Sequence, residues 1–402
     1  MTLSLPSFTW FWLRPFSLLL LLLGAGLLAQ AQSNATPAIR YVRTDGTNAD
    51  PATATTWATS TTNLQGAIDA SAAGDQVWIA AGTYKPGGNA NTDREKSFAM
   101  KNGVAIYGGF APTGSPTLTA RNPDSFTTVL SGNLGTVGES YHVILNSGGL
   151  NATAVLDGFV ITDGNANGSG LDNEAFGGGM LNVSSSPTLT NCLFVSNSAS
   201  RGGGMGNRGS SNPTLTNCRF VSNSASQGGG MYNISGSSPT LTNCNFVSNI
   251  ASSNRGGGMF NLDNSSPSLT NCNFQSNTAS VSGAGMYNQS SSPNLTNCSF
   301  LNNGNPSEGG GMDNRSSSPT LTNCRFQGNS AFTGGAMFNR ESSNPTLTNC
   351  IFLGNKSVNG GWAIFNVGTA RLTNCILFNN GGSATFSNGV NIITNVIGTI
   401  TV

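Results

Sequence analysis

Acidic side chains are the first candidates for chemistry in this chain of 402 residues. Two carboxylates ~5–9.5 Å apart can cleave a glycosidic bond, and clustered carboxylates can hold Ca²⁺. From residue 171 to 380 the sequence repeats a unit of about 26 residues, and its acids are sparse. They are Asp172, Glu174, Asp263, Glu308, Asp313 and Glu341. No two fall at the same position of neighbouring repeats, so we expect no stacked carboxylate pair there.

One stretch at the start of the repeats is richer in oxygen ligands. It contains Asp157, Asp163, Asp172 and Glu174, together with Asn165, Asn167 and Asn173. Loops of this kind can bind Ca²⁺, but a solvated Gly-rich insertion has the same composition. We favour the insertion, and the calcium alternative stays open.

The basic side chains offer little chemistry. The one histidine, His142, lies in an alternating apolar run over residues 141–145, which is typical of a strand residue rather than a general base. Arg315 and Arg340 occupy the same position in successive repeats, with Arg208 on the same edge, and they could contact a sugar acid or simply be solvated. We therefore predict no catalytic residue, no cofactor and no metal site.

Eight cysteines mark the repeat. They are Cys192, Cys218, Cys244, Cys272, Cys298, Cys324, Cys350 and Cys375, spaced 26, 26, 28, 26, 26, 26 and 25 residues. In an exported protein they could form disulfides, and their redox state stays open at this point. However, identical positions in stacked coils give parallel Cβ vectors, which do not suit disulfide geometry. No C-x₂-C spacing typical of zinc sites occurs. We therefore predict buried free thiols.

The repeat itself predicts the fold. Periods of this length indicate stacked structural units, and the many Gly, Asn, Ser and Pro residues disfavour helices. In one copy, Leu241, Cys244, Phe246 and Met231 should point inward while the threonines beside Leu241 point outward. The asparagine before each cysteine should turn the chain and stack its amide with its neighbours. This pattern predicts an all-β, right-handed parallel β-helix with about eight regular 26-residue coils.

A leucine-rich repeat is the rival interpretation. The string from Leu215 through Cys218 and Phe220 to Asn223 fits L-x-x-L-x-L-x-x-N. The rest of that repeat should supply apolar residues on a helix or turn. Here it supplies Gly-Gly-Gly-Met and Ser-Ser-Pro, which favours the β-helix.

The chain divides into five predicted segments. Residues 1–31 form a signal peptide, because an apolar run too short to span a bilayer precedes Ala29-Gln30-Ala31; a membrane anchor is the alternative. Residues 32–103 are a leader whose short helix near 63–70 caps the first coil. Irregular coils over 104–170, regular repeats over 171–380 and terminal coils over 381–402 follow. Residues 163–176 read as a protruding loop.

A resemblance to known proteins adds to this reading. Gly334-Gly335-Ala336-Met337 with residues 349–355 resembles the repeats of polymorphic outer membrane proteins. The repeats and the leader over residues 41–86 are similar to bacterial secreted β-helix proteins of the pectin-lyase-like group. This resemblance implies a right-handed parallel β-helix. It leaves activity undecided, because the group includes lyases, hydrolases and adhesins.

Two function classes remain. Near-neutral charge excludes the positive field that nucleic acid binding requires. Uniform coils favour a non-catalytic, secreted or cell-surface rod that is structural, adhesive or glycan-binding; we expect a monomer with no membrane span in the mature chain. The alternative is a polysaccharide lyase or glycoside hydrolase with its site in the irregular residues 98–176.

Overall fold

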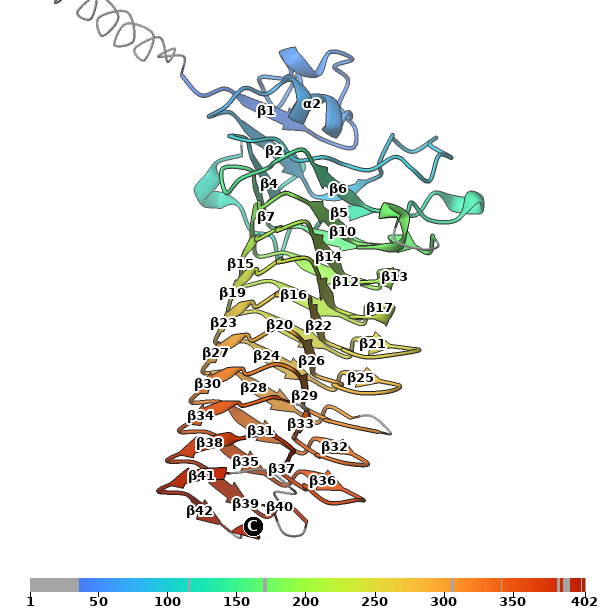
Figure 1. The fold of residues 1–402 in the computed structure, drawn as a ribbon. Coiled ribbons are helices and arrows are strands. Elements are labelled where there is room, and N and C mark those ends of the chain that lie inside the picture. The colour runs from blue at the N-terminus through green and yellow to red at the C-terminus, as the bar shows by residue number, and fades with distance from the viewer. Residues whose placement is uncertain are drawn as a thin grey trace, which may run out of the picture. The chain divides into compact units, whose positions relative to one another are not determined.

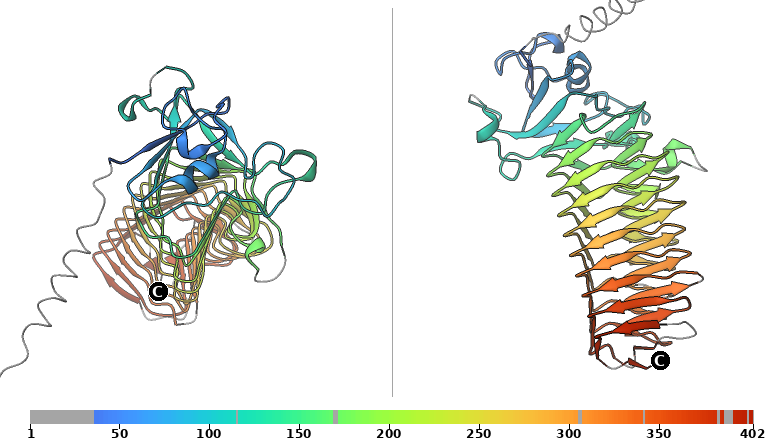
Figure 2. Two further views of the ribbon diagram at one scale, coloured as in Figure 1. Left: turned by 90° about the horizontal axis from the view of Figure 1, so that it is seen from above. Right: turned by 60° about the vertical axis from the view of Figure 1, so that its left-hand side comes forward.

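The computed structural model describes residues 36–114, 116–168, 172–304, 307–340, 342–381, 384–385, 391–398 and 400–401. The predicted signal peptide lies outside the described residues. One compact unit spans Ala38–Val402, and the description below concerns this unit. Its strands stack coil upon coil, as Figures 1 and 2 show.

Three long parallel sheets form the walls of the coils. Sheet 1 consists of β1 (Ile39–Val42), β2 (Gln76–Ala80), β4 (Ala105–Phe110), β7 (Val155–Asp157), β11 (Thr188–Thr190), β15 (Thr214–Thr216), β19 (Thr240–Thr242), β23 (Ser268–Thr270), β27 (Asn294–Thr296), β30 (Thr320–Thr322), β34 (Thr346–Thr348), β38 (Ala370–Thr373) and β41 (Asn391–Thr394). Sheet 2 consists of β3 (Gly82–Tyr84), β5 (Thr128–Ser131), β8 (Val160–Thr162), β12 (Leu193–Val195), β16 (Arg219–Val221), β20 (Asn245–Val247), β24 (Asn273–Gln275), β28 (Ser299–Leu301), β31 (Arg325–Gln327), β35 (Ile351–Leu353), β39 (Ile376–Phe378) and β42 (Ile397–Gly398).

Sheet 3 closes the coil, and shorter pairings extend its corner. Sheet 3 consists of β6 (Ile144–Ser147), β10 (Met180–Val183), β14 (Met205–Arg208), β18 (Met231–Asn233), β22 (Met259–Leu262), β26 (Met286–Gln289), β29 (Met312–Arg315), β33 (Met337–Arg340) and β37 (Ile364–Asn366). The shorter strands are β9 (Asn165–Ala166), β13 (Ser198–Arg201), β17 (Ser224–Gln227), β21 (Ile250–Ala251), β25 (Thr278–Ala279), β32 (Ser330–Ala331), β36 (Lys356–Ser357), β40 (Ala384–Thr385) and β43 (Ile400–Thr401). These strands lie where one long sheet gives way to the next (Figure 1). The predicted loop over 163–176 is thus partly ordered, because β9 pairs with β13.

The interior is built from rows of identical side chains, as the repeat predicts. Leu241, Cys244, Phe246 and Met231 are all fully buried. From Phe194 to Phe352 the phenylalanine rings stack with centroids 4.6 to 4.9 Å apart. All eight cysteines are buried and free, as expected. The regular units carry strands and no helix among the described residues, so the leucine-rich repeat is excluded.

The predicted amide ladder exists at the corner between sheets 1 and 2, but it lies on the surface. Asn271 has a φ of 54°, and its Nδ2 donates to Oδ1 of Asn243 at 3.1 Å. The left-handed turn is therefore confirmed. The side chains of this row are exposed, however, so their amides are not the buried groups that hold the stack.

Two further amide ladders are buried, and the sequence analysis did not find them. At the second corner, Asn249 Nδ2 donates to Oδ1 of Asn277 and to the carbonyl of Phe220. On the inner side of sheet 3, Asn233 Nδ2 donates to Oδ1 of Asn261 at 2.8 Å. Asn249 and Asn233 are both fully buried. The residue before Asn249, Ser248, makes the turn with a φ of 55°.

A short helix covers the first coil, as predicted. Helix α2 (Leu64–Ala70) is capped by Asn63, whose Oδ1 accepts from the amide of Gly66 at 2.9 Å. Its Leu64, Ala67 and Ile68 are buried. The parallel sheet already begins at β1 and β2, ahead of residue 104. Four short 3₁₀ turns complete the described elements: Pro51–Thr53, Leu118–Ala120, Gly135–Val137 and Asn173–Ala175.

Candidate functional site

Two of the acidic side chains singled out in the sequence, Asp157 and Asp163, are engaged in structural contacts. Asp157 Oδ1 accepts from Nη2 of Arg121 at 2.6 Å and from Nδ2 of Asn191 at 3.0 Å. Asp157 therefore terminates the exposed amide ladder. Asp163 accepts from the hydroxyls of Ser131 and Thr162 at 2.7 and 3.2 Å.

The remaining members of that acidic stretch lie on an exposed turn. Asp172 precedes the 3₁₀ turn that contains Glu174, and both residues are exposed. Within the described part of the chain, no three His, Cys, Asp or Glu side chains are grouped so that they could hold a metal ion.

His142 is a buried structural residue. Its side chain is 4% exposed, and Nδ1 donates to the carbonyl of Gly177 at 3.0 Å. Burial lowers the pKa of His142 from its ordinary value of 6.5, although the backbone bonds with Gly177 and Phe176 oppose this shift. The imidazole is therefore neutral near pH 7 and lies between two coils.

The stacked arginines of sheet 3 share a carboxylate. Arg315 and Arg340 are register partners on β29 and β33, and both form ion pairs with Glu308. Arg208 instead lies over the ring of Phe176, 5.1 Å from its centroid. Glu308 therefore neutralises one of the two positive charges and engages both guanidinium groups, which makes them less available to a sugar acid.

A shallow cleft of about 290 Å³ borders the irregular region. Pro123, Asp124, Thr127 and Thr128 line this cleft together with residues of β8 and β12 and with Asn191, Asn217 and Arg219. Among the described residues, Asp124 is the one carboxylate that lines this cleft. Asp157, which precedes the lining residue Gly158, forms an ion pair with Arg121. The cleft therefore lacks a pair of free carboxylates in its described lining.

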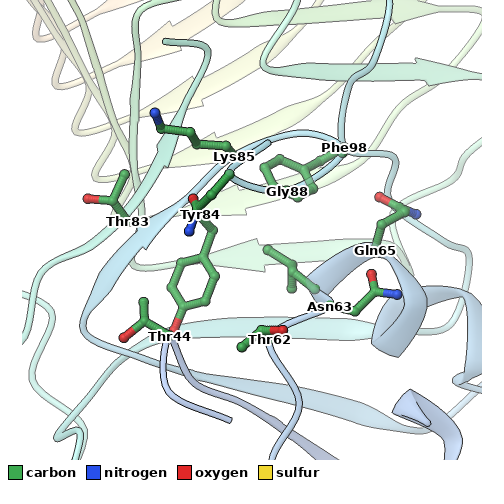
Figure 3. A pocket seen from close by; sticks show the side chains of 12 residues that line it. Thr44, Thr62, Asn63, Gln65, Thr83, Tyr84, Lys85, Gly88 and Phe98 are labelled. Atoms are coloured by element: carbon green, nitrogen blue, oxygen red, sulfur yellow. The ribbon is translucent and has the colours of Figure 1, made fainter. Parts of the chain in front are cut away.

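A larger pocket of about 530 Å³ opens beside helix α2 at the first coil. Its lining residues come from four stretches of the chain, and Figure 3 shows their side chains. Its lining residues are Thr44, Thr62, Asn63, Leu64, Gln65, Thr83, Tyr84, Lys85, Gly87, Gly88, Asn89 and Phe98. We call this space the cap pocket. Its volume lies in the range of small-molecule sites.

The cap pocket has rigid walls. The Tyr84 hydroxyl donates to the carbonyl of Ala80 at 3.1 Å, and burial raises its pKa further above the ordinary value of 10.0. Gln65 accepts from the amide of Ala99 at 2.8 Å. Phe98 supplies a buried ring at the base. These side chains are held in place before any ligand arrives.

The pocket rim carries polar groups that are available to a ligand. In the described structure the hydroxyls of Thr44, Thr62 and Thr83 form no hydrogen bond to protein, and all three residues are exposed. Lys85 is half-buried and has no ion-pair partner among the residues described. The rim therefore offers three hydroxyls and one cation.

Sequence reasoning did not identify the cap pocket. Its residues come from four stretches of the leader, and each stretch also has an ordinary structural role. Helix α2 was predicted as a cover for the core, and that prediction holds. The open polar space beside Tyr84 depends on the path of residues 85–98. The sequence carries no recognisable signal for that path.

Comparisons with known proteins agree with the fold. Residues 248–397 match the family model described as "Right handed beta helix region". The fold of the chain is a right-handed parallel β-helix, as its sequence predicts. No curated protein matches the chain.

Two solved structures are similar to the chain at low identity. One is the pectate lyase Pel9A, with 13% identity over 88% of this chain and 78% of that chain and a TM-score of 0.43. The other is the tailspike protein gp49 of the Acinetobacter baumannii bacteriophage Fri1, a capsular polysaccharide depolymerase, with 15% identity and a TM-score of 0.40. This second alignment covers 92% of this chain and 64% of the tailspike chain.

In the described part of the chain, no helix is long and apolar enough to cross a bilayer.

Proposed function

We propose that this protein is a non-catalytic, secreted or cell-surface β-helix that binds glycans, with the cap pocket as its main binding site. The supporting observation is the polar rim around a preformed pocket of about 530 Å³. Sugars bind through hydroxyl groups, and the unbonded hydroxyls of Thr44, Thr62 and Thr83 can exchange hydrogen bonds with them. The ring of Phe98 offers an apolar base, as binding pockets commonly do.

Lys85 narrows the ligand class. A cation without a carboxylate partner favours an anionic group, and charge-assisted hydrogen bonds are stronger than neutral ones. The proposed ligand is therefore the end of a glycan that carries a carboxylate, such as a uronic acid residue. The pocket volume suits one or two sugar residues rather than a long chain.

Binding without turnover is part of this proposal. The carboxylates Asp157 and Asp163 of the irregular region are bonded to Arg121 and Ser131. A glycoside hydrolase requires one acid and one base or nucleophile facing the same bond. The alternative, a lyase or hydrolase acting within residues 98–176, would need a catalytic acid and base other than Asp157 and Asp163, and Asp124 is the one carboxylate in the described lining of the cleft.

Calorimetric titration with a panel of acidic and neutral oligosaccharides tests the proposal. We expect an acidic oligosaccharide to bind, and Lys85→Ala to weaken binding about tenfold, the loss of roughly 1.4 kcal/mol. Lys356→Ala, which removes an exposed lysine from β36, is the matched control and should bind like the wild type.

The same mixtures are then assayed for newly formed chain ends. Release of products by the wild type would contradict a purely binding role. Equal affinity of the Lys85→Ala variant and the wild type would move the binding site away from the cap pocket.

A further inference from the structure

The outer face of sheet 1 carries a regular array of threonines. On each regular strand the two outward positions flank a buried leucine, as Thr240 and Thr242 flank Leu241 on β19. From β11 to β38 the outward residues are Thr188, Thr190, Thr214, Thr216, Thr240, Thr242, Ser268, Thr270, Asn294, Thr296, Thr320, Thr322, Thr346, Thr348, Arg371 and Thr373. All are threonine except Ser268, Asn294 and Arg371. We call this surface the threonine face.

Strand pairing keeps these side chains in straight rows. Thr214 pairs with Thr240, and Thr216 with Thr242, without a register shift. The same register continues through β23, β27, β30 and β34. Strands lie ~4.8 Å apart and alternate residues on one strand lie ~6.6 Å apart. The threonine face is therefore a two-row lattice with these two repeats.

The hydroxyls of this lattice face solvent. Within the described structure only Thr188 uses its side-chain hydroxyl internally, donating to the carbonyl of Ala152 at 2.9 Å. From β11 to β34 the outward positions carry no charge and no aromatic ring. Each threonine other than Thr188 thus presents one methyl group and one hydroxyl group with no protein partner among the described residues.

Sheet 2 provides an internal comparison. Its outward positions occur in the same coils and have comparable exposure, yet they vary from Leu193 and Val195 to Arg219 and Val221, and then to Asn273 and Gln275. The repeats have therefore diverged at exposed positions of sheet 2 and have remained almost uniform on sheet 1. A requirement of the strand alone would apply to both sheets.

We propose that the threonine face binds ice, or water ordered as in ice. Ice presents oxygen atoms in flat planes whose repeats are of the same order as those of this lattice. The hydroxyls can join the oxygen lattice and the methyl groups can sit between its rows. A charged ligand would need complementary charge, and a crystalline polysaccharide would be met by flat aromatic rings. The face from β11 to β34 has neither.

Ice growth measurements on the full chain test this inference, which does not depend on the cap pocket. The gap between melting and freezing temperatures is measured with a seed crystal for the wild type, Thr242→Tyr and Asn245→Tyr. Residue 242 lies on the threonine face, and residue 245 is an outward position of sheet 2 in the same coil. We expect a measurable gap for the wild type and the Asn245→Tyr control, and at least a fivefold smaller gap for Thr242→Tyr.

Two results would overturn the inference. The first is a failure to find ice binding on the threonine face: the folded wild type leaves ice growth unchanged, or Thr242→Tyr and Asn245→Tyr reduce the gap between melting and freezing temperatures equally. The second is binding to cellulose or chitin particles that Thr242→Tyr abolishes while ice growth is unaffected, which would assign the face to a crystalline polysaccharide. Thermal unfolding confirms that each variant is folded, and Thr322→Tyr replaces Thr242→Tyr if the latter does not fold.

Discussion

The asparagine rows separate into surface and interior ladders with different energetic roles. Asn249 is fully buried: its Nδ2 donates to Phe220 and Asn277, and its Oδ1 accepts from the backbone and side-chain amides of Asn223. Asn271 belongs to the exposed ladder, and its main contribution is a left-handed turn with a φ of 54°. Burial rather than residue type therefore determines how much each amide stabilises the stack.

Substitution by alanine should reveal this difference. Asn249→Ala leaves several buried groups without partners, each costing about 1–3 kcal/mol, so we expect a loss of at least about 3 kcal/mol. Asn271→Ala should cost only about 1–2 kcal/mol, the penalty of the left-handed backbone for a residue with a Cβ. Urea unfolding measures both values. Equal losses would show that the interior ladder does not hold the coils together.

The buried histidine predicts a pH effect near neutrality. The folded pKa of His142 is lowered below 6.5, so the unfolded chain binds the proton more readily. The contribution of His142 to stability is therefore complete above about pH 6.5 and decreases as the pH falls below that value, by at most about 1.4 kcal/mol per pH unit. Burial opposes the ionisation of Asp75, but hydrogen bonds from the backbone amides of Ala72 and Ala38 and from Arg40 lower its pKa below the ordinary value of 3.8. The stability that Asp75 contributes is therefore lost only as the pH falls below about 3.8.

Unfolding curves at pH 7, 6 and 5 measure this effect. His142→Gln retains a hydrogen-bond donor but does not titrate in this range, so its stability should be nearly constant between pH 7 and 5. If the variant loses stability with the same slope as the wild type, the effect belongs to another group.

At the scale of elements, the glycine corners set how closely the chain can fold back on itself. A Cβ at Gly229 would lie 2.5 Å from the carbonyl oxygen of Ile250 and 2.7 Å from that of Gly257. Both contacts are with backbone atoms of the next coil, which cannot move without breaking the sheet. We therefore expect Gly229→Ala to destabilise by about 1–3 kcal/mol or more. Ser226→Ala, a half-buried position of the same corner, should change the free energy of unfolding by under about 0.5 kcal/mol.

The cysteine row should be chemically silent in the folded protein. All eight thiols are buried inside the coils, and reactive cysteines are partly exposed, so a reagent cannot reach them without opening the stack. A thiol reagent should modify almost none of the cysteines natively and all eight after denaturation. Disulfides found by mass spectrometry of the native protein would contradict the free-thiol assignment.

Much of the fold could be predicted from the sequence because the repeat reports each environment several times over. The identity of Leu241, Cys244, Phe246 and Met231 across copies defines the inward positions. A typical repeat places asparagines in three motifs, T-N-C, S-N and M-x-N. These asparagines look alike in sequence, and only the structure shows which of them are buried. The cap pocket was missed because it lies in the leader, where no repeat exists to reveal which residues share a surface.

At the scale of the whole molecule, the proposed binding site lies in the cap, apart from the regular coils. Each coil contacts its neighbours, so the stack should tolerate the loss of coils in register. Deleting residues 218–271 removes two repeats and joins Asn217 to Cys272. Asn217 and Asn271 are each followed by a cysteine in the full chain, so the junction has the same sequence and every inward row stays in register. The cap pocket, built from residues 44–98, is left intact.

The affinity of this shortened chain for an acidic oligosaccharide is the most direct test of the account. We predict that it folds cooperatively and binds with the same dissociation constant as the full chain, because the ligand occupies the cap pocket. An affinity that decreases as coils are removed, while Lys85→Ala has no effect, would contradict the account and would place the ligand along the coils.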